Sequence, residues 1–458
     1  MGDSRVFDVV IVGGGPGGYP TAVRASQHGL SVALIERHKL GGECTNYGCV
    51  PTKALLRAAK LARDLVRYAW ARGSVDGASV LEWARSVADG VRLGVGRLLE
   101  HYGVTVISDE ATGVDGNCVI TRGGRYCGRR GVIIATGSEP RRLSNIPFDG
   151  VNVIDNRGLI SLEKPPESIL IVGAGYVGVE FSYALASLGS NVHLVEIMDR
   201  PLPALPREAS LQALRALRSL GVRVFLSHKV VNAELNKGKV VVTLEGRKGR
   251  EIVEVEKVLI AVGRTPNSNL KGLRESGVKI DTRGFIETDC HMRTGNPMIY
   301  ATGDVRGPPL LAHKAFVEAL IAADNIAGYD ACLKDFVIPE VVYIRPEIVR
   351  VYRPTNCESA SVRVRVDALA RARIEGEGGL VKLTYEKSTG RIVELLMIFE
   401  GASEVAGEAA ALVANGLTIY EAAKIVHPHP TMSEALWEAL HIASGSPVHL
   451  VDVRRRAQ

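Results

Sequence analysis

The sequence predicts an α/β protein of several domains, two of which are built around Rossmann-like dinucleotide-binding units. Its 458 residues are too many for one hydrophobic core. A run of β-branched residues followed at once by Gly-x-Gly-x-x-Gly occurs twice, near residue 12 and near residue 172. In both places a small-residue helical stretch and a second strand follow. These features are typical of a βαβ unit that holds a dinucleotide.

The first unit begins with DVVIVGGGPGG at residues 8–18 and ends with the strand SVALIE. Gly13 permits a tight turn, Gly15 lets the backbone approach a pyrophosphate, and Gly18 lets helix and strand pack closely. The N-terminus of the following helix then faces the phosphates. Glu36, at the end of the second strand, is expected to accept hydrogen bonds from an adenosine ribose.

The second unit, SILIVGAGYVGVEFSYALASLGSNVHLVE at residues 168–196, has the same spacing between its first glycine and its acid. That acid, Glu196, would repel a 2′-phosphate, which favours NAD over NADP, although Arg200 lies nearby and could offset the effect. Glycine turns that serve only helix–strand packing are the alternative, but two full copies with equal spacing favour two dinucleotide sites. The glycines of this unit are Gly173, Gly175 and Gly178.

Three strand-plus-turn segments join the two units, and each contains a glycine or acid expected to contact a cofactor. Asp304 follows a strand and a turn glycine, so we expect it to bind a ribose or ribityl hydroxyl; a plain turn aspartate is the alternative. The segments are IIATGSEPR with Gly137, VLIAVGRTPN with Gly263, and MIYATGDV with Asp304. The expected domains are 1–147, 148–269, 270–337, which returns to the first, and 338–458.

Composition and charge exclude several classes of function. The net charge of +6 is small for this length and requires no nucleic-acid partner. No run of 18 apolar residues is present, so no membrane-spanning helix is predicted, and the first residues do not resemble a signal peptide. The seven cysteines are scattered and odd in number, unlike a secreted disulfide framework, so a cytoplasmic location is expected.

Two cysteines, Cys44 and Cys49, lie in GGECTNYGCVPTK just before a predicted helix. In a regular α-helix their Cα atoms would be about 8.6 Å apart, whereas a disulfide tolerates at most about 7 Å. If they bond, the segment cannot be an undistorted helix, and Gly48 and Pro51 supply the break. Such a bond would add little stability, so redox chemistry is its favoured role. Two buried thiols and a metal-ligand pair are the alternatives.

The other cysteines give weaker signals. Cys118 and Cys127 flank a probable hairpin and would face each other in one register, but we favour two free thiols over a disulfide there. The positions of the last three cysteines in the sequence suggest no pairing, so they are interpreted as core or surface thiols: Cys290, Cys332 and Cys357.

With these motifs in order, the chain resembles the pyridine nucleotide–disulfide oxidoreductases, the flavoprotein family of dihydrolipoamide dehydrogenase, glutathione reductase and mercuric reductase. The matching motifs are the two glycine units, GGECTNYGCVPTK, ATGDV with LAHKA, and HPHPTMSE. The resemblance implies FAD at the first site, NAD at the second and a redox-active Cys44–Cys49 disulfide. It also implies a homodimer formed through a C-terminal α+β dimerisation domain. A helix that begins near His313, just after Ala312, is implied to point its positive end at the flavin.

The resemblance also implies roles for five further side chains. In HPHPTMSE, His429 resembles the family's acid–base and Glu434 the carboxylate that orients it, whereas His427 is interpreted as structural. Lys53 follows Cys49 by about one helical turn, so its ammonium is implied to lie near the flavin, with Glu180 as its partner. From sequence alone, each of these residues could instead be an ordinary surface or helix-end residue.

The branch of the family that fits best is dihydrolipoamide dehydrogenase, because Glu196 argues against an NADP-dependent glutathione reductase and the C-terminal VDVRRRAQ lacks the cysteine pair of mercuric reductase. The implied reaction is attack of a dihydrolipoamide thiolate on Cys44, release of Cys49 beneath FAD, and hydride transfer to NAD. The substrate is a small dithiol or a lipoyl-bearing protein of a 2-oxoacid dehydrogenase complex. Another NAD(P)H-dependent disulfide reductase and a quinone-reducing diaphorase remain alternatives. A non-enzymatic assembly subunit is disfavoured by the intact motifs.

Two departures from the family pattern stand out. Glu43 occupies the position directly before Cys44 where Thr or Ser is usual, and its negative charge is expected to disfavour a thiolate. The segment 341–358 matches loosely, because the usual small or acidic residue is missing before Pro346. This second departure concerns the dimer interface, partner docking and access of the substrate more than the chemistry.

Overall fold

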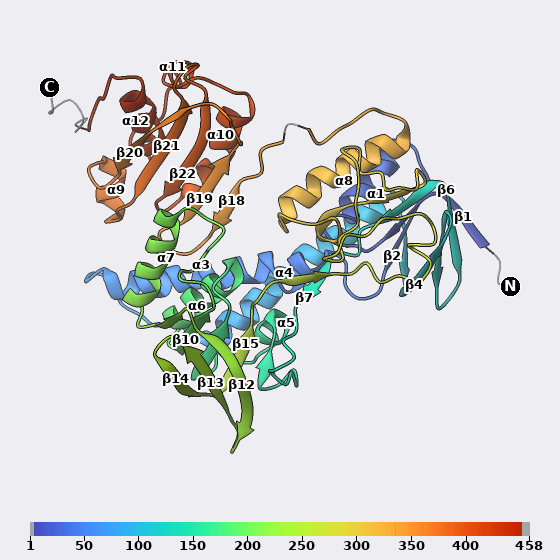
Figure 1. Ribbon diagram of the computed structural model, residues 1–458, viewed down its shortest axis with the longest axis horizontal. Helices are drawn as coiled ribbons and strands as arrows, with labels where there is room; N and C mark the ends of the chain where they lie inside the picture. The colour runs from blue at the N-terminus through green and yellow to red at the C-terminus, as the bar shows by residue number, and fades with distance from the viewer. Residues whose placement is uncertain (1–3, 335, 451–458) are drawn as a thin grey trace.

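The computed structural model describes residues 4–334 and 336–450, which form three packed units (Figure 1). The first unit is a seven-stranded sheet. Six strands follow the order β3-β2-β1-β6-β5-β4, and β17 pairs with the C-terminal part of β6, beyond its pairing with β5. The β-branched run Val9–Val12 forms the buried centre of this sheet, as expected for a parallel strand covered on both faces. Its strands are β1 (Ser4–Val12), β2 (Val32–Glu36), β3 (Thr105–Ser108), β4 (Ala111–Asp115), β5 (Cys118–Thr121), β6 (Arg125–Ile134) and β17 (Ile299–Ala301).

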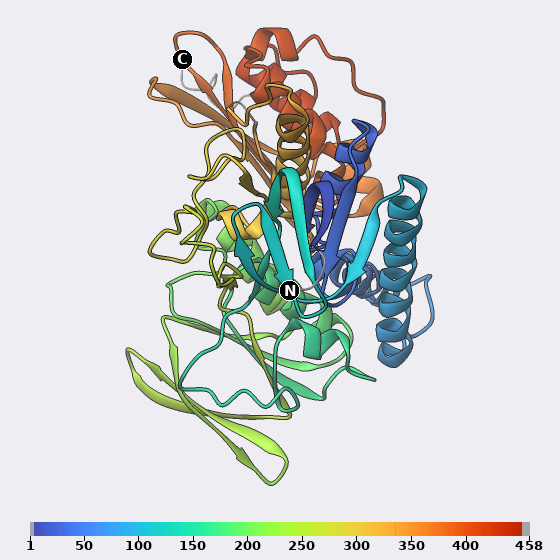
Figure 2. The same cartoon turned by 90° about the vertical axis from the view of Figure 1, so that its right-hand side faces the viewer.

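Three helices cover one face of the first sheet. They are α1 (Tyr19–Gln27), α4 (Gly77–His101) and α8 (Ala312–Ala327). Ala22, Leu99 and Ile321 of these helices share one hydrophobic core with Val9 and Ile11 of β1. Figure 2 shows the long helix α4 standing beside the sheet. Leu273, Val278 and Ile286 cover the opposite face and join Val10 and Val12 in a second core.

The second unit repeats the parallel core of the first. Its sheet has the order β11-β10-β9-β15-β8, so β9 lies between β10 and β15 as β1 lies between β2 and β6. These strands are β8 (Val153–Ile154), β9 (Ser168–Val172), β10 (Asn191–Glu196), β11 (Arg223–Leu226) and β15 (Lys257–Ile260). Its helices are α5 (Asn156–Ile160), α6 (Tyr176–Ser187) and α7 (Arg207–Ser219). An antiparallel meander follows β11: β12 (Lys229–Asn236), β13 (Lys239–Gly246) and β14 (Gly249–Val255). A two-stranded ribbon connects the units: β7 (Ser138–Pro140) and β16 (Arg264–Pro266).

The C-terminal unit is α+β, as predicted. Its antiparallel sheet has the order β18-β19-β22-β21-β20. The strands are β18 (Glu340–Val342), β19 (Ile348–Tyr352), β20 (Ser359–Arg365), β21 (Leu380–Glu386) and β22 (Ile392–Ile398). The helices are α9 (Ala370–Glu375), α10 (Ala402–Ala414), α11 (Ile419–Ala422) and α12 (Glu434–Ala443). Neighbouring residues of β19 face opposite ways, since Ile348 packs in the core that contains α3 (Cys49–Arg67) and Val349 packs in the core that contains α10 and α12.

Helix α3 belongs to the core between the second and third units. Leu55, Leu56 and Ala59 are buried against Phe181 of α6 and Ile348 of the C-terminal sheet. The helix therefore starts near the first sheet and contacts both other units along its length. No helix in the described part of the chain is both long and apolar enough to cross a membrane.

Two predictions about cysteines were wrong. Cys118 and Cys127 are not free thiols but lie directly opposite each other on β5 and β6 and form a disulfide, with Cα atoms 4.0 Å apart. Cys290 and Cys332 also form a disulfide across 42 positions, with Cα atoms 4.9 Å apart. The first depends on the hairpin register, and the second on a tertiary contact that no local spacing could indicate. Cys357 is free and exposed.

Candidate active site

Cys44 and Cys49 form a disulfide at a break between two helices. The short helix α2 (Gly42–Asn46) carries Cys44, and α3 begins at Cys49, with Gly48 as its N-cap. The Cα atoms are 4.7 Å apart, so the segment is not an undistorted helix, as the spacing argument required. Cys49 is the first residue of a 19-residue helix. When the disulfide is reduced, the positive end of this helix favours a thiolate.

The carboxylate of Glu43 is fully engaged by groups from the second unit. Asn156 Nδ2 donates to Oε1 at 2.7 Å, and Arg157 Nη2 lies 2.7 Å from Oε2. Arg264 Nη1 lies 3.7 Å from Oε1. Burial lowers the pKa of Arg157, but the bond and charge of Glu43 outweigh it and hold that pKa above its ordinary value. The negative charge expected to disfavour a thiolate is therefore neutralised by two guanidinium groups.

Lys53 and Glu180 are brought together from helices α3 and α6. Lys53 Nζ donates to Glu180 Oε2 at 2.8 Å, and the backbone N–H of Tyr343 donates to Oε1 at 3.0 Å. The ammonium also lies 4.5 Å from the centre of the Tyr343 ring. Glu180 is 4% exposed, so the carboxylate is fixed by both partners with little competition from water. Tyr343 belongs to the C-terminal unit, and its contact with this pair was not predicted from the sequence.

The acids of the two glycine units are held in the same way. Glu36 accepts from the backbone N–H groups of Gly14 and His38 at 2.7 and 2.8 Å. Glu196 accepts from those of Ala174 and Met198 at 2.7 and 2.9 Å. Each carboxylate is thus fixed beside its glycine turn at the end of the second strand. Arg200 donates to the carbonyl of Pro203, so it makes no ion pair with Glu196.

The glycine turns fit a dinucleotide at both sites. A Cβ added at Gly13 or Gly173 would lie 2.3 or 2.5 Å from a backbone oxygen, and both residues have positive φ, so only glycine is accommodated. At Gly15 the nearest atom to an added Cβ is 3.7 Å away, and at Gly175 none lies within 4 Å. Gly175 therefore faces open space, and Gly15 has only an ordinary contact with Gly42, so a pyrophosphate can approach the backbone at both turns. The third glycines, Gly18 and Gly178, pack tightly against the first.

The connecting segments bring further polar groups to the first site. Asp304 follows Gly303 in the short 3-10 helix Gly303–Arg306, and its Oδ2 accepts from Ser138 Oγ at 2.5 Å. Arg264 Nε donates to the same hydroxyl at 2.6 Å and lies 3.7 Å from Asp304 Oδ2. Gly137 and Gly263 have positive φ and no neighbouring atom within 4 Å of an added Cβ. Ala312 is the first residue of α8, which confirms the helix start expected near His313.

Sequence reasoning did not single out Ser138, Asn156, Arg157 or Arg264. Ser138 and Arg264 directly follow the turn glycines Gly137 and Gly263, so their place beside the motifs was a usable signal. Asn156 and Arg157 lie in no motif.

His429 and Glu434 form a pair at the start of α12. Glu434 Oε1 lies 2.9 Å from His429 Nδ1, and Oε2 accepts from the backbone N–H of Thr431 at 2.9 Å. Burial raises the pKa of Glu434, but these hydrogen bonds outweigh it and hold the pKa below its ordinary value. The side chain of Glu434 is 7% exposed, whereas that of His429 is 64% exposed. A buried anion therefore orients an imidazole that solvent can reach.

The structure does not bring this pair to the cysteines of the same chain. The C-terminal sheet lies between them, since α3 packs on one face and α12 on the other. His427 is held separately, with Nε2 2.8 Å from Glu408 Oε1 of α10. Its ring is 4% exposed, which agrees with the structural interpretation of this histidine.

Comparison with known proteins identifies the family. Residues 7–319 match the family model described as pyridine nucleotide-disulphide oxidoreductase, and residues 338–440 match its dimerisation domain. The chain belongs to the pyridine nucleotide-disulphide oxidoreductase family. As a member it is an FAD- and NAD-dependent oxidoreductase, and the dimerisation domain supports the predicted homodimer.

The chain is similar to several curated proteins along its whole length. It is 37% identical to the dihydrolipoyl dehydrogenase of Thermus scotoductus, over 98% of this chain and 100% of that protein. It is 34% identical to the dihydrolipoyl dehydrogenase of Bacillus subtilis, over 97% and 98%. Among solved structures, LpdA of Mycobacterium tuberculosis matches with a TM-score of 0.88 at 26% identity, over 96% of this chain and 99% of that one. The HOCl-induced flavoprotein disulfide reductase RclA of Escherichia coli matches with a TM-score of 0.85 at 25% identity, over 95% and 99%.

Proposed function

We propose that the protein is a dihydrolipoyl dehydrogenase that oxidises a dithiol of the dihydrolipoamide class through its Cys44–Cys49 disulfide. The observation that carries the proposal is this disulfide at the first residue of α3, with the Lys53–Glu180 pair one turn further along. The names of the curated relatives support the choice of substrate. We further propose a cytoplasmic location and a lipoyl-bearing protein of a 2-oxoacid dehydrogenase complex as partner.

In the proposed thiol–disulfide step, His429 of the partner subunit accepts a proton from one substrate thiol. The resulting thiolate attacks Cys44 Sγ, the Cys44–Cys49 bond breaks, and Cys49 leaves as a thiolate. The second substrate thiol then attacks the mixed disulfide, which releases Cys44 and the oxidised substrate. Two electrons have moved from the dithiol to the cysteine pair. Glu434 keeps the imidazole in the orientation that accepts the proton.

A partner subunit is required because the histidine cannot reach the cysteines of its own chain through the C-terminal sheet. The exposed imidazole faces outward from the unit that matches the dimerisation domain. Two chains related by a twofold axis can each supply the histidine for the other's disulfide, which is the usual symmetry of a homodimer.

The glycine units hold the two cofactors in this proposal. FAD is assigned to the first, where Glu36, Asp304 and the N-terminus of α8 would hold it, and NAD is assigned to the second, where Glu196 would hold it. When bound, FAD would supply the two-electron redox chemistry that links the cysteine pair to NAD. Lys53, held by Glu180, contributes a fixed positive charge beside the redox pair.

The test is an anaerobic titration followed by absorbance, with NADH added to one sample and dihydrolipoamide to another. The proposal expects both reagents to give the same two-electron form, with a long-wavelength absorbance band from the Cys49 thiolate. The Cys49→Ser variant should lose this band and all dithiol oxidation while still reducing an artificial dye with NADH. If NADH bleaches the flavin of the wild-type enzyme and dihydrolipoamide leaves it unchanged, another disulfide or a quinone replaces dihydrolipoamide as the substrate.

A further inference from the structure

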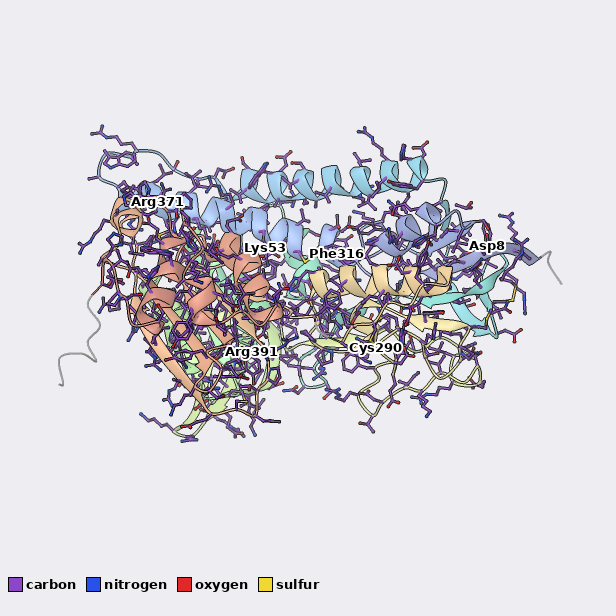
Figure 3. All side chains as sticks on the ribbon, turned by 90° about the horizontal axis from the view of Figure 1, so that it is seen from above. Asp8, Lys53, Cys290, Phe316, Arg371 and Arg391 are labelled. Atoms are coloured by element: carbon purple, nitrogen blue, oxygen red, sulfur yellow. A yellow bond between two sulfur atoms is a disulfide. The ribbon has the colours of Figure 1, made fainter. Side chains whose placement is uncertain are left out.

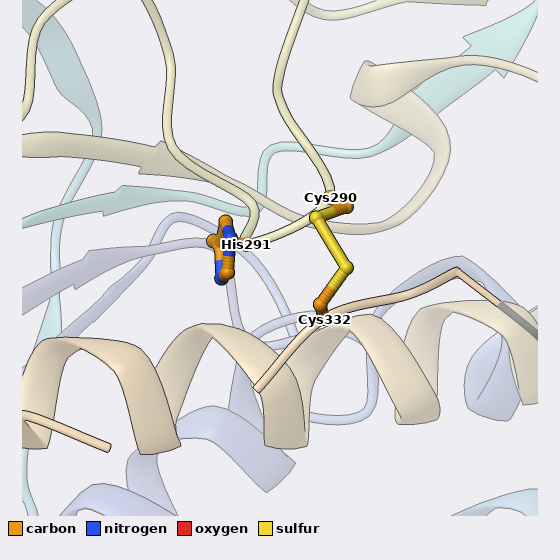
Figure 4. A group of neighbouring side chains, drawn as sticks. All are labelled: Cys290, His291 and Cys332. Carbon is orange, nitrogen blue, oxygen red and sulfur yellow. A yellow bond between two sulfur atoms is a disulfide. The ribbon is translucent and has the colours of Figure 1, made fainter. Parts of the chain in front are cut away.

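The cysteine pair Cys290–Cys332 lies beside a histidine and apart from the redox disulfide. Cys290, His291 and Cys332 each place one ligand atom within 4.8 Å of the other two (Figure 4). Cys290 and His291 belong to the turn before β17, and Cys332 follows the end of α8. Figure 3 labels Cys290 well apart from Lys53, whose helix starts at Cys49. The catalytic scheme uses none of these three residues.

The backbone around this cluster is held without the disulfide. The N–H of Leu333 donates to the carbonyl of Cys290 at 2.9 Å. The buried amide of Asn325 donates to the carbonyls of His291 and Ala331, at 3.2 and 2.7 Å. These bonds join the two segments on both sides of the sulfur atoms. Cleavage of the disulfide therefore leaves two thiols at nearly the same positions instead of releasing a free loop.

A hydrogen bond fixes which ring nitrogen of His291 is available to a metal. His291 Nδ1 lies 2.9 Å from the carbonyl oxygen of Ala331, and because a carbonyl only accepts, Nδ1 carries the hydrogen. The lone pair is then on Nε2. Metal-binding histidines commonly donate their other ring N–H to a backbone carbonyl or carboxylate in this way. The carboxylate of Asp330 also lies 3.3 Å from Nδ1, so it supports the same orientation of the ring.

We propose that the reduced cluster of Cys290, His291 and Cys332 binds one Zn²⁺ ion, and that its disulfide is the oxidised, metal-free form of the same site. Two thiolates and an imidazole suit zinc, with water as the fourth ligand. Tetrahedral zinc with Zn–S bonds of about 2.3 Å needs sulfurs about 3.8 Å apart, a small movement once the S–S bond is broken.

Reduction of the Cys290–Cys332 bond takes two electrons, which a dithiol supplies. A dithiol reduces the Cys290–Cys332 bond, giving two cysteine thiols and the oxidised, cyclic disulfide of the reductant. Zinc binding then displaces one proton from each thiol, so the two thiolates neutralise the charge of the ion. The site does not depend on the proposed substrate of the enzyme, since any dithiol of sufficient reducing power serves.

The test uses the full-length holoenzyme with Cys44→Ser and Cys49→Ser, so that the redox pair cannot take up the metal. This parent is reduced with a phosphine, freed of reductant without oxygen, and titrated with ZnCl₂ against a chromophoric chelator. The matched variant adds Cys290→Ser and Cys332→Ser and keeps the Cys118–Cys127 pair. The proposal expects the parent to bind one more equivalent of Zn²⁺ than this variant, and none at this site when oxidised. His291→Ala in the parent should weaken binding by at least about tenfold.

Equal zinc stoichiometry in parent and variant, or unchanged affinity in His291→Ala, would overturn the proposal. If the variant fails to fold, as judged by FAD content, the reduced parent alone decides. Co²⁺ added to it should produce a thiolate-to-metal charge-transfer band that disappears when the disulfide is reformed. A reduced parent without that band has no such site.

Discussion

Replacing Glu434 with glutamine tests whether the buried carboxylate orients His429, the proposed acid–base. In the wild type its two oxygens accept from His429 Nδ1 and from the Thr431 N–H, each at 2.9 Å. The glutamine side chain of the variant has the same shape but only one accepting oxygen. Its NH₂ group must therefore face one of the two donors, so either the imidazole or the backbone N–H loses its partner.

The size of the effect follows from this contact. A hydrogen bond to a charged group contributes about 1.5–3 kcal/mol, and solvent does little to replace it because Glu434 is 6% exposed. We therefore expect kcat/KM for dihydrolipoamide oxidation to fall by about 10- to 150-fold in Glu434→Gln.

The assay compares dihydrolipoamide oxidation with reduction of an artificial dye by NADH, which requires no proton transfer by His429. Glu408→Gln is the matched control, because it alters the other histidine–carboxylate pair, at His427, and should leave both activities within about twofold. A loss of less than about threefold in Glu434→Gln would refute the orienting role. An equal loss of dye reduction would mean that the substitution damages the fold and not the proton transfer.

Three further predictions concern stability. Lys60→Met should destabilise the protein by about 3–5 kcal/mol in a urea titration, because it removes the ammonium that lies 2.6 Å from the buried Glu347 and 3.0 Å from the partly buried Glu400. Burial raises the pKa of Glu400 and Lys60 partly offsets this, so the pKa should rise further in the variant. The variant should therefore lose more stability than the wild type as pH rises from about 4.5, and equal pH dependence would contradict this. Burial lowers the pKa of His427, but the bond and charge of Glu408 outweigh burial and hold that pKa above its ordinary value. The stabilisation by this pair should therefore be complete below about pH 6.5 and disappear as pH rises further. The melting temperatures of wild type and His427→Gln should converge at the higher pH. Cys290→Ser with Cys332→Ser should cost more stability than Cys118→Ser with Cys127→Ser, about 4 against about 2.6 kcal/mol by loop entropy, since the closed loops span 42 and 9 positions; the reverse order in urea would contradict the argument.

The glycine units could be predicted from sequence because their geometry is local. The spacing of Gly13 and Glu36 determines a turn, a helix and a strand that fold together, and the hydrogen bond from Gly14 to Glu36 lies within that unit. The break between Cys44 and Cys49 was accessible for the same reason, since helix dimensions alone excluded a regular helix there.

Contacts between distant segments could not be predicted in the same way. The neutralisation of Glu43 depends on Arg157, which lies 114 positions away and in no motif. The Cys290–Cys332 bond depends on where α8 ends against the turn before β17, a tertiary result. The register of β5 and β6 decided the Cys118–Cys127 pair, because a shift of one residue would turn the two side chains to opposite faces.

Helix α3 has a consequence for how this protein can be divided. It begins with a cysteine of the redox pair, meets the second unit through Lys53 and Glu180, and meets the C-terminal unit through Lys60 and Glu347. A fragment that ends before the C-terminal unit would expose the apolar side of α3 and leave the Lys60 ammonium without its carboxylates. The C-terminal unit is therefore not a replaceable module: exchanging it with that of a relative requires an acid at the Glu347 position, or a simultaneous change at Lys60.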